Sequence, residues 1–279
     1  MNNKTPEVVE NLNLKYPNFV MPKVYWIGCT EVNWEEIENY LRDTDQLEFL
    51  KDIEEARKQG LNGGEILVSF YAKACYSSLT DKKNKNITKI RDIENNVMGV
   101  IDSGHGSVTE HVSLNFMITN CSRVFTHELV RHRVGTAFSQ TSGRYVRADV
   151  LNLVIDPILE PCYDIIDDCR KYIEQTYKKM EERLNIDNVK DFATKKKLTS
   201  SMRRLIPNGV SNEIGFSVNL RTLRQTIEAR TSEHAEWEIR LIFEQIYNVV
   251  KSKFPIMFFD ATEEIKGGIV EVKFKNKKI

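Results

Sequence analysis

Histidine and arginine gather in one stretch of this chain, from Gly104 to Arg147. Four of its five histidines lie there, within the runs GHGSVTEH and VRHRVGTAFSQTSGRYVR. Its cations are arginines, and no lysine occurs between Lys89 and Lys171. Arginine is a rigid, permanently charged fork that binds phosphate or carboxylate through two parallel hydrogen bonds, whereas lysine is a mobile point charge. The stretch therefore predicts an anion-binding site, and its arginines are Arg123, Arg131, Arg133, Arg144 and Arg147.

A second segment, from Ser201 to Arg240, repeats the same preference for arginine and again contains no lysine. Its arginines are Arg203, Arg204, Arg221, Arg224, Arg230 and Arg240. We interpret the two segments as two walls of one anion-binding site.

Small and hydroxyl residues follow the run RHR at residues 131–133. Their backbone N–H and hydroxyl groups can approach a phosphate closely, which predicts a nucleotide-phosphate loop. The alternative is an ordinary turn after a helix whose C-terminal dipole favours bases. That alternative explains one arginine but not five. The residues of the predicted loop are Gly135, Thr136, Ser139, Thr141, Ser142 and Gly143.

Several common site types lack their central residues. No GxGxxG follows a strand, and neither GxxxxGK[ST] nor HExxH occurs, which argues against dinucleotide-binding Rossmann, P-loop and zinc-protease sites. His127 and His132 are five residues apart, and Glu128 is the nearest carboxylate on that predicted helix. Because helical metal ligands are usually three or four residues apart, we expect no metal site.

The composition describes an electrically balanced chain with enough apolar residues for a sizeable core. Of its 279 residues 41% are hydrophobic, and 40 basic residues face 40 acidic ones. Balanced charge argues against a non-specific nucleic-acid binder. Five cysteines without a CxxC pair argue against a disulfide framework and structural zinc. With no signal peptide and no apolar run of the ~18 residues that span a membrane, we expect a soluble cytoplasmic protein without nucleic-acid or membrane partners.

The elements that hold these residues follow from hydrophobic periodicity. Alternation predicts a strand at residues 111–119, and short strands are expected at 23–29 and 268–274. For residues 66–75 periodicity permits a strand or a helix, and we favour a helix. The chain shows no repeat and no linker, so we expect a single domain. The other helices are expected at residues 34–42, 47–57, 88–102, 123–133, 161–184 and 189–205.

The longest helix is expected from Asn219 to about Lys251. On such a helix Arg221 would share a face with Gln225, and Arg230 with His234. Arg221 and Arg230 are nine residues apart and would lie about half a turn out of phase at ~100° per residue. We therefore expect these two arginines to serve different ligands or different subunits.

Four ordered motifs between about residues 66 and 250 resemble those of the flavin-dependent thymidylate synthases. They are H-x-S-x-x-E-H at 105–111, R-H-R followed by S-x-R-Y at 131–133 and 142–145, N-x-R at 219–221, and R-x-x-x-H-A-x-W-E-I-R at 230–240. The resemblance implies an α+β domain with a mostly antiparallel sheet flanked by helices. It also implies a homotetramer with shared active sites that converts dUMP to dTMP, using FAD, methylenetetrahydrofolate as one-carbon donor and NADPH as reductant, without a cysteine nucleophile.

The resemblance assigns roles residue by residue. Arg230 and Ser142 are implied to be catalytic, and Arg230 to favour ionisation of the uracil ring. The implied dUMP contacts are Glu128, Arg131, Ser142, Gly143, Arg144, Arg203 and Arg230, and the implied flavin contacts are Ser107, Arg131, His132, Arg133, Gln140, Asn219, Arg221 and Gln225. Residues 66–250 are expected to form the family domain, residues 1–65 an N-terminal extension with the start of the domain, and 251–279 a C-terminal tail.

Departures from the family pattern leave alternatives open. Eight residues, Val134 to Thr141, separate RHR from Ser142, where the family usually has seven. A flavoprotein of the same fold acting on another pyrimidine nucleotide is one alternative, and a module whose RHR helix contacts nucleic-acid phosphates is another. A folate-only thymidylate synthase is suggested by Pro161-Cys162, but Tyr163 stands where that enzyme type has histidine after its nucleophile.

Overall fold

The computed structural model describes residues 15–80, 84, 86, 90–144 and 149–278. The predicted N-terminal arm up to residue 14, part of the polar loop at 77–86, and Tyr145 and Arg147 of the first arginine-rich stretch lie outside the described residues.

A four-stranded antiparallel sheet forms the centre of the molecule, with strand order β1-β2-β4-β3. On β2 the side chains of Leu114, Phe116 and Ile118 are buried and their neighbours are more exposed, which confirms the predicted alternation. Phe116 of β2 pairs with Phe216 of β4 and with Trp26 of β1, so aromatic residues fill the middle of the buried face. The strands are β1 (Lys23–Cys29), β2 (Ser113–Ser122), β3 (Thr136–Gln140) and β4 (Ser211–Asn219).

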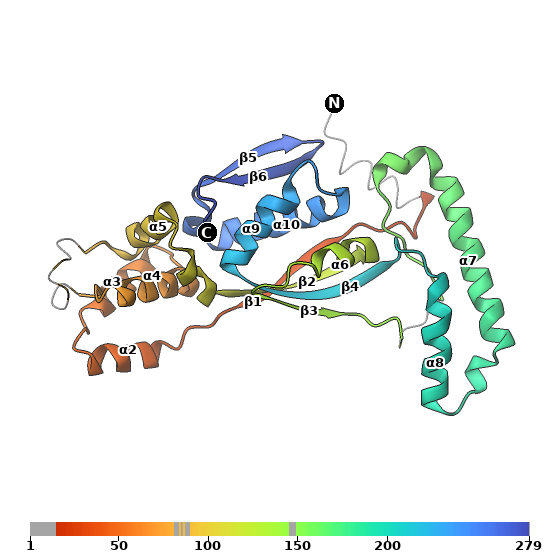
Figure 1. Cartoon of the computed structure of the whole chain (residues 1–279), viewed down its shortest axis with the longest axis horizontal. Helices are drawn as coiled ribbons and strands as arrows, with labels where there is room; N and C mark the ends of the chain where they lie inside the picture. The colour runs from red at the N-terminus through yellow and green to blue at the C-terminus, as the bar shows by residue number, and fades with distance from the viewer. Residues whose placement is uncertain (1–14, 81–83, 85, 87–89, 145–148, 279) are drawn as a thin grey trace.

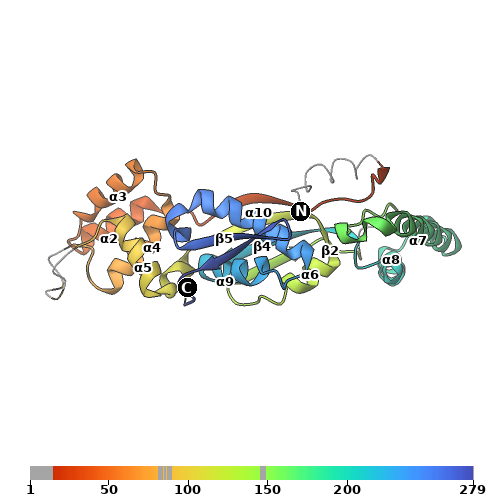
Figure 2. The same ribbon diagram turned by 90° about the horizontal axis from the view of Figure 1, so that it is seen from above.

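Helices cover one face of this sheet (Figures 1 and 2). They are α6 (Arg123–Leu129), α9 (Leu220–Thr231) and α10 (Trp237–Lys253). On the opposite face, Tyr25, Ile27 and Met117 remain 42%, 64% and 37% exposed. The sheet therefore has one face in the core of this chain and one exposed face that carries both apolar and polar side chains.

A group of helices packs at one end of the sheet, and its central member settles the ambiguity at residues 66–75. Asn62 and Glu65 form a reciprocal capping box that starts a helix there. Nine of its residues are buried, which explains why the sequence shows no clear amphipathic period. The next helix ends at Gly104, whose φ of 74° suits glycine. The four helices are α2 (Trp34–Asp43), α3 (Phe49–Lys58), α4 (Gly63–Cys75) and α5 (Ile93–Ser103).

Two helices project from the other end of the sheet as an arm (Figure 1), namely α7 (Tyr163–Arg183) and α8 (Phe192–Met202). In the part of the chain that the structure covers, no helix is long and apolar enough to cross a bilayer. Short 3-10 segments join the elements at η1 (Gly106–His111), η2 (Pro157–Cys162), η3 (Ile186–Asn188), η4 (Arg203–Leu205) and η5 (Pro255–Phe258).

A hairpin of β5 (Ala261–Lys266) and β6 (Ile269–Phe274) lies over α9 and α10 (Figure 1). Val272 and Phe274 of β6 belong to the main hydrophobic core. The predicted strand at 268–274 is thereby confirmed, while its partner β5 was not predicted.

The expectation of one helix from Asn219 to Lys251 is wrong. Helix α9 ends at Thr231, and α10 begins at Trp237 after Glu236, whose carboxylate accepts hydrogen bonds from the N–H groups of Glu238 and Ile239. Because both helices pack on the same sheet, their apolar residues keep one spacing across the break. Strand β4 was also missed, although SNEIGFSVN alternates clearly. The predicted α+β class with a mostly antiparallel sheet flanked by helices is confirmed.

Candidate functional site

Three of the four motifs meet at the first turn of α9. The N–H of Asn219 donates to the carbonyl of Gly135, 2.8 Å away, in the segment after RHR. The N–H of Leu220 donates to the carbonyl of Val112, 2.9 Å away, directly after the GHGSVTEH run. Segments that are far apart in sequence are therefore fixed side by side by backbone hydrogen bonds.

Glycine at position 135 allows this close approach. Gly135 has a φ of +67°, and a Cβ there would lie 2.2 Å from Nδ2 of Asn219. The Asn219 side chain also caps α9, because its oxygen accepts from the N–H of Thr222 at 2.8 Å. A larger residue at 135 would push the RHR segment away from the start of α9.

The fourth motif joins the second through Arg230 and His132. The Nε of Arg230 donates to Nε2 of His132 at 2.8 Å, and its Nη1 lies 3.4 Å from a carboxylate oxygen of Glu128. Since Nε2 accepts this bond, the proton of a neutral His132 lies on Nδ1. Burial, and then the charge of Arg230, lower the pKa of His132. The imidazole is thus held neutral beside a permanent cation.

Arg221 connects α9 to the GHGSVTEH motif. Its Nη1 lies 2.6 Å from a carboxylate oxygen of Glu110, and its Nη2 donates to the carbonyl of Lys278 at 3.2 Å. Ser107 is exposed in η1, a few residues before Glu110. The predicted contacts Ser107, Arg131, His132, Asn219 and Arg221 are therefore carried by segments that meet around the start of α9.

Arg123 and Arg203 form a second cationic cluster at the other end of α6. A Cβ on Gly143 would lie 3.1 Å from Nη2 of Arg123 and 3.8 Å from Cδ of Arg203. Burial, and then the charge of Arg203, lower the pKa of Arg123. Two guanidinium groups held close together beside a glycine favour binding of an anion such as phosphate. The sequence suggested no specific ligand for Arg123, because the residue was notable only for its place in the arginine-rich stretch.

Burial separates the arginines of the site from those of the core. Within the described residues, no ion pair is formed by Arg123, Arg131, Arg133, Arg144 or Arg203. By contrast, Arg224 is fully buried and pairs with Asp260, and buried Arg240 donates to the carbonyls of Thr231 and Lys266. The interpretation of both arginine-rich segments as walls of one site is therefore wrong for Arg224 and Arg240, which hold the fold together.

The predicted phosphate loop is partly a strand. Residues 136–140 form β3, and the side-chain amide of Gln140 donates to Oγ1 of Thr126 at 3.2 Å. Ser142, Gly143 and Arg144 follow the far end of that strand. At ~3.3 Å per residue, roughly 20 Å of backbone separates Gly135 from Thr141. The Arg230–His132 pair and the Arg123–Arg203 cluster lie toward opposite ends of α6, a helix of seven residues.

His234 and Gln225 differ in how far they fit the prediction. His234 lies in the turn between α9 and α10, where its N–H donates to Oγ of Ser232 at 3.4 Å, so the expected shared helical face with Arg230 does not exist. Gln225 lies on α9 and is exposed.

The cysteines offer no activated nucleophile near either arginine group. Cys121 is buried as expected, and burial raises the pKa of its thiol to about 12. Cys162 is exposed at the end of η2. Cys75 is exposed on the last turn of α4, although apolar residues precede it in the sequence.

Comparison with known proteins gives consistent matches over most of the chain. The family model of the thymidylate synthase complementing protein matches residues 59–256. A flavin-dependent thymidylate synthase of Mycobacterium tuberculosis (strain H37Rv) is 33% identical over 205 residues, which are 71% of this chain and 80% of the relative. One from Mycobacterium marinum is 32% identical over 220 residues, 76% of this chain and 86% of the relative.

Proposed function

The chain belongs to the thymidylate synthase complementing proteins, the flavin-dependent thymidylate synthases, and we propose that it converts dUMP to dTMP with FAD as cofactor. The family inferred from the four motifs is thereby confirmed. Methylenetetrahydrofolate as one-carbon donor and NADPH as reductant complete the proposed reaction. The observation that carries the proposal is the meeting of the motifs at the start of α9, with Arg230 hydrogen-bonded to His132.

The donor groups of this chain fit a flavin dinucleotide. Arg131 and Arg133 are exposed, and neither forms an ion pair with another described residue. Ser107 and Asn219 add a hydroxyl and an amide, and Arg221, Gln140 and Gln225 complete the proposed flavin contacts. These groups would hold the pyrophosphate and the ring edge. When bound, the flavin supplies the redox and one-carbon chemistry that no side chain provides.

The proposed substrate contacts have two parts with different tasks. Arg144, Arg203, Ser142 and Gly143, together with Arg123, would bind the dUMP phosphate through charge-assisted hydrogen bonds. Arg230, oriented by His132 and Glu128, would stabilise negative charge on the uracil ring. A neutral His132 leaves the Arg230 charge uncompensated on that side, which strengthens its effect on an anionic ring.

We propose a homotetramer in which each active site takes residues from more than one chain. The exposed sheet face, with Ile27 and Met117 among its apolar side chains, offers a surface for a second copy.

Other features of the sequence agree with this proposal. All five cysteines are free, which fits a reducing cytoplasm. For the domain bounds, the proposed catalytic part, residues 66–250, holds three of the four sheet strands and all four motifs, while the proposed flanking parts contribute β1 (residues 1–65) and the core residues Val272 and Phe274 (residues 251–279).

The visible spectrum of the purified protein is the decisive measurement. We expect a flavin spectrum that NADPH bleaches, and dTMP formation from dUMP and methylenetetrahydrofolate. Turnover of another pyrimidine nucleotide in preference to dUMP would replace the proposed substrate. A colourless protein whose affinity for DNA falls steeply with salt would favour the nucleic-acid module instead.

A further inference from the structure

Glu238 belongs to the WEIR run at residues 237–240 and hydrogen-bonds to the residue that starts α6. Its side chain is 3% exposed, and Oε1 accepts from the N–H of Ser122 at 2.6 Å. Its other oxygen accepts from the hydroxyl of Ser122, and that hydroxyl accepts from the N–H of Phe125 at 3.1 Å as the N-cap of α6. One buried carboxylate on α10 thus holds both the backbone and the capping side chain from which α6 begins.

Arg240, two residues further along the same helix, binds the end of α9. It is 8% exposed, its Nε donates to the carbonyl of Thr231 at 3.2 Å, and its Nη2 donates to the carbonyl of Lys266 at 2.7 Å. Thr231 is the last residue of α9 and directly follows Arg230. A helix end leaves carbonyls without partners, so a buried guanidinium there fixes its position.

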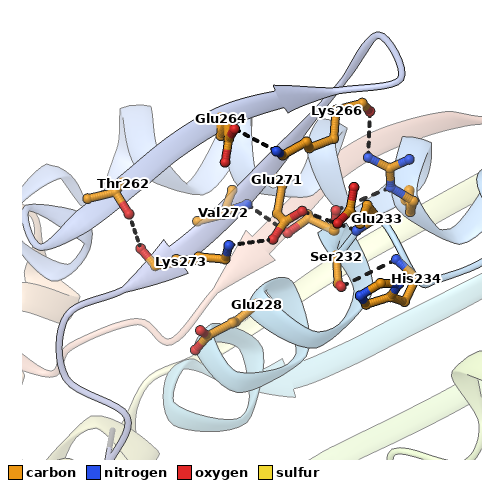
Figure 3. A network of polar contacts seen from close by, with 12 residues as sticks. Glu228, Ser232, Glu233, His234, Thr262, Glu264, Lys266, Glu271, Val272 and Lys273 are labelled. Atoms are coloured by element: carbon orange, nitrogen blue, oxygen red, sulfur yellow. Dashed lines mark hydrogen bonds and ion pairs between the residues drawn. The ribbon is translucent and has the colours of Figure 1, made fainter.

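The β5–β6 hairpin also forms hydrogen bonds with the end of α9 and with the turn that follows it. Figure 3 shows Lys266 and Glu271 of the hairpin beside the turn that carries Ser232, Glu233 and His234. A carboxylate oxygen of Glu271 accepts from the N–H of Glu233 at 3.2 Å, and the N–H of Val272 donates to Oγ1 of Thr231 at 2.9 Å. The end of α9 is therefore held on two sides.

Glu238 and Arg240 together act on the pair formed by His132 and Arg230. Helix α6 leads into Glu128 and His132, whereas α9 ends directly after Arg230, and these two helix ends meet through the 2.8 Å bond between Nε and Nε2. Neither Glu238 nor Arg240 hydrogen-bonds to His132 or Arg230. Glu238 instead fixes the start of α6, the short helix whose last turn carries Glu128 and precedes His132, and Arg240 fixes the end of α9 beside Arg230. A displacement of about 1 Å is enough to weaken a hydrogen bond or a catalytic contact.

We propose that Glu238 and Arg240 are positioning residues that set the Arg230–His132 geometry for turnover. The proposal rests on the proposed function for its kinetic part, but the geometry can be measured without turnover. It gives the WEIR run a task separate from ligand binding, since both residues are buried and hydrogen-bond to the neighbours of Arg123 and Arg230, not to the arginines of the site themselves.

The kinetic test compares Glu238→Gln with Glu244→Gln. Glu244 lies on the same helix and accepts from the N–H of Val270 at 2.9 Å, and it is not hydrogen-bonded to the described residues of α6 or of the end of α9. For Glu238→Gln we expect kcat to fall about tenfold, the change that ~1.4 kcal/mol of lost transition-state stabilisation produces, with a smaller change in the KM for dUMP. Glu244→Gln should keep kcat within about twofold at a similar loss of Tm. Equal kcat for the two variants would overturn the proposal.

A double-variant cycle shows whether Glu238 acts through Arg230. In an Arg230→Gln background, Glu238→Gln should lower kcat by less than about twofold further, while its effect on Tm remains. A full tenfold loss in that background would mean that Glu238 acts independently of Arg230. Ser122→Ala serves as a milder second variant in case Glu238→Gln folds poorly, and the same non-additivity is expected.

The geometric test needs no catalysis. In protein with labelled histidine rings, the His132 resonance, assigned with His132→Gln, reports its titration. Burial, and then the charge of Arg230, lower its pKa, and Glu128 lies 3.4 Å from Nη1 of that arginine. Displacing Arg230 through Glu238→Gln or Arg240→Lys should raise the pKa of His132, whereas Glu244→Gln should leave it unchanged. An unchanged pKa in the first two variants would refute the positioning role, even if the wild-type protein makes dTMP. A shifted pKa in a protein that makes no dTMP would overturn the proposed function alone.

Discussion

Replacing Arg224 by Met tests whether this arginine belongs to the core instead of the anion site. Arg224 and Asp260 have side chains that are 0% and 1% exposed, and Nη2 lies 2.9 and 3.0 Å from the two carboxylate oxygens. Nη1 donates to the carbonyl of Met257, and the guanidinium carbon lies 4.0 Å from the ring centroid of Phe274. Methionine fills most of the same volume, so the main effect is the loss of charge opposite Asp260.

The expected loss of stability follows from that buried carboxylate. Removing one partner of a buried ion pair leaves an uncompensated charge and costs ~3–5 kcal/mol, a large part of the total stability of a typical protein. Adding Asp260→Asn removes the charge and should recover a part of this loss, because asparagine can still accept from the N–H of Asn276, now 3.3 Å from the carboxylate. The double variant should therefore be more stable than Arg224→Met alone.

Urea unfolding at one fixed protein concentration measures these differences, since oligomer formation would make the midpoint depend on concentration. The matched control is Arg203→Met, an exposed arginine of the second cationic cluster. It should change the free energy of unfolding by less than about 0.5 kcal/mol and weaken dUMP binding. A loss below about 1 kcal/mol for Arg224→Met, or a double variant no more stable than the single one, would refute this account of Arg224.

Three further outcomes test other parts of the structure. Arg144→Lys keeps the charge but loses the two parallel hydrogen bonds of the guanidinium, so dUMP binding measured by calorimetry should weaken by roughly 1–3 kcal/mol. The flavin content should stay the same. An unchanged affinity for dUMP would show that Arg144 does not bind the phosphate. Burial raises the pKa of Glu65 from 4.5 to about 7, so the folded state binds a proton that the unfolded state has released, and stability should fall as pH rises from 4.5 to 7. Glu65→Gln should reduce that slope, by at most ~1.4 kcal/mol per pH unit, and an identical slope in urea titrations would contradict the burial of its charge. A variant with all five cysteines changed to Ser or Ala should keep its turnover if it folds, whereas loss of dTMP formation by Cys162→Ala with both ligands bound would contradict a flavin-centred reaction.

Local sequence patterns predicted most of the individual helices and strands. Alternation predicted β2, and hydrophobic periodicity predicted the end of α5 to within one residue. The same reasoning missed β4, whose alternation was equally visible, because Gly215 and two asparagines lowered its apparent strand propensity. It also joined α9 and α10, since helical spacing continues across a turn when both helices pack against one sheet.

Within the arginine-rich segments, residue type and spacing determined that an anion site exists and which family carries it. They could not determine which arginines face a ligand. That depends on long-range partners: Asp260 lies 36 residues from Arg224 and cancels its charge in the core, whereas Arg123 and Arg203 meet with no described carboxylate between them. A guanidinium group has the same chemistry in both places. Only the tertiary structure decides whether its partner is supplied by the protein or is left for a ligand, because folding brings that partner from elsewhere in the chain.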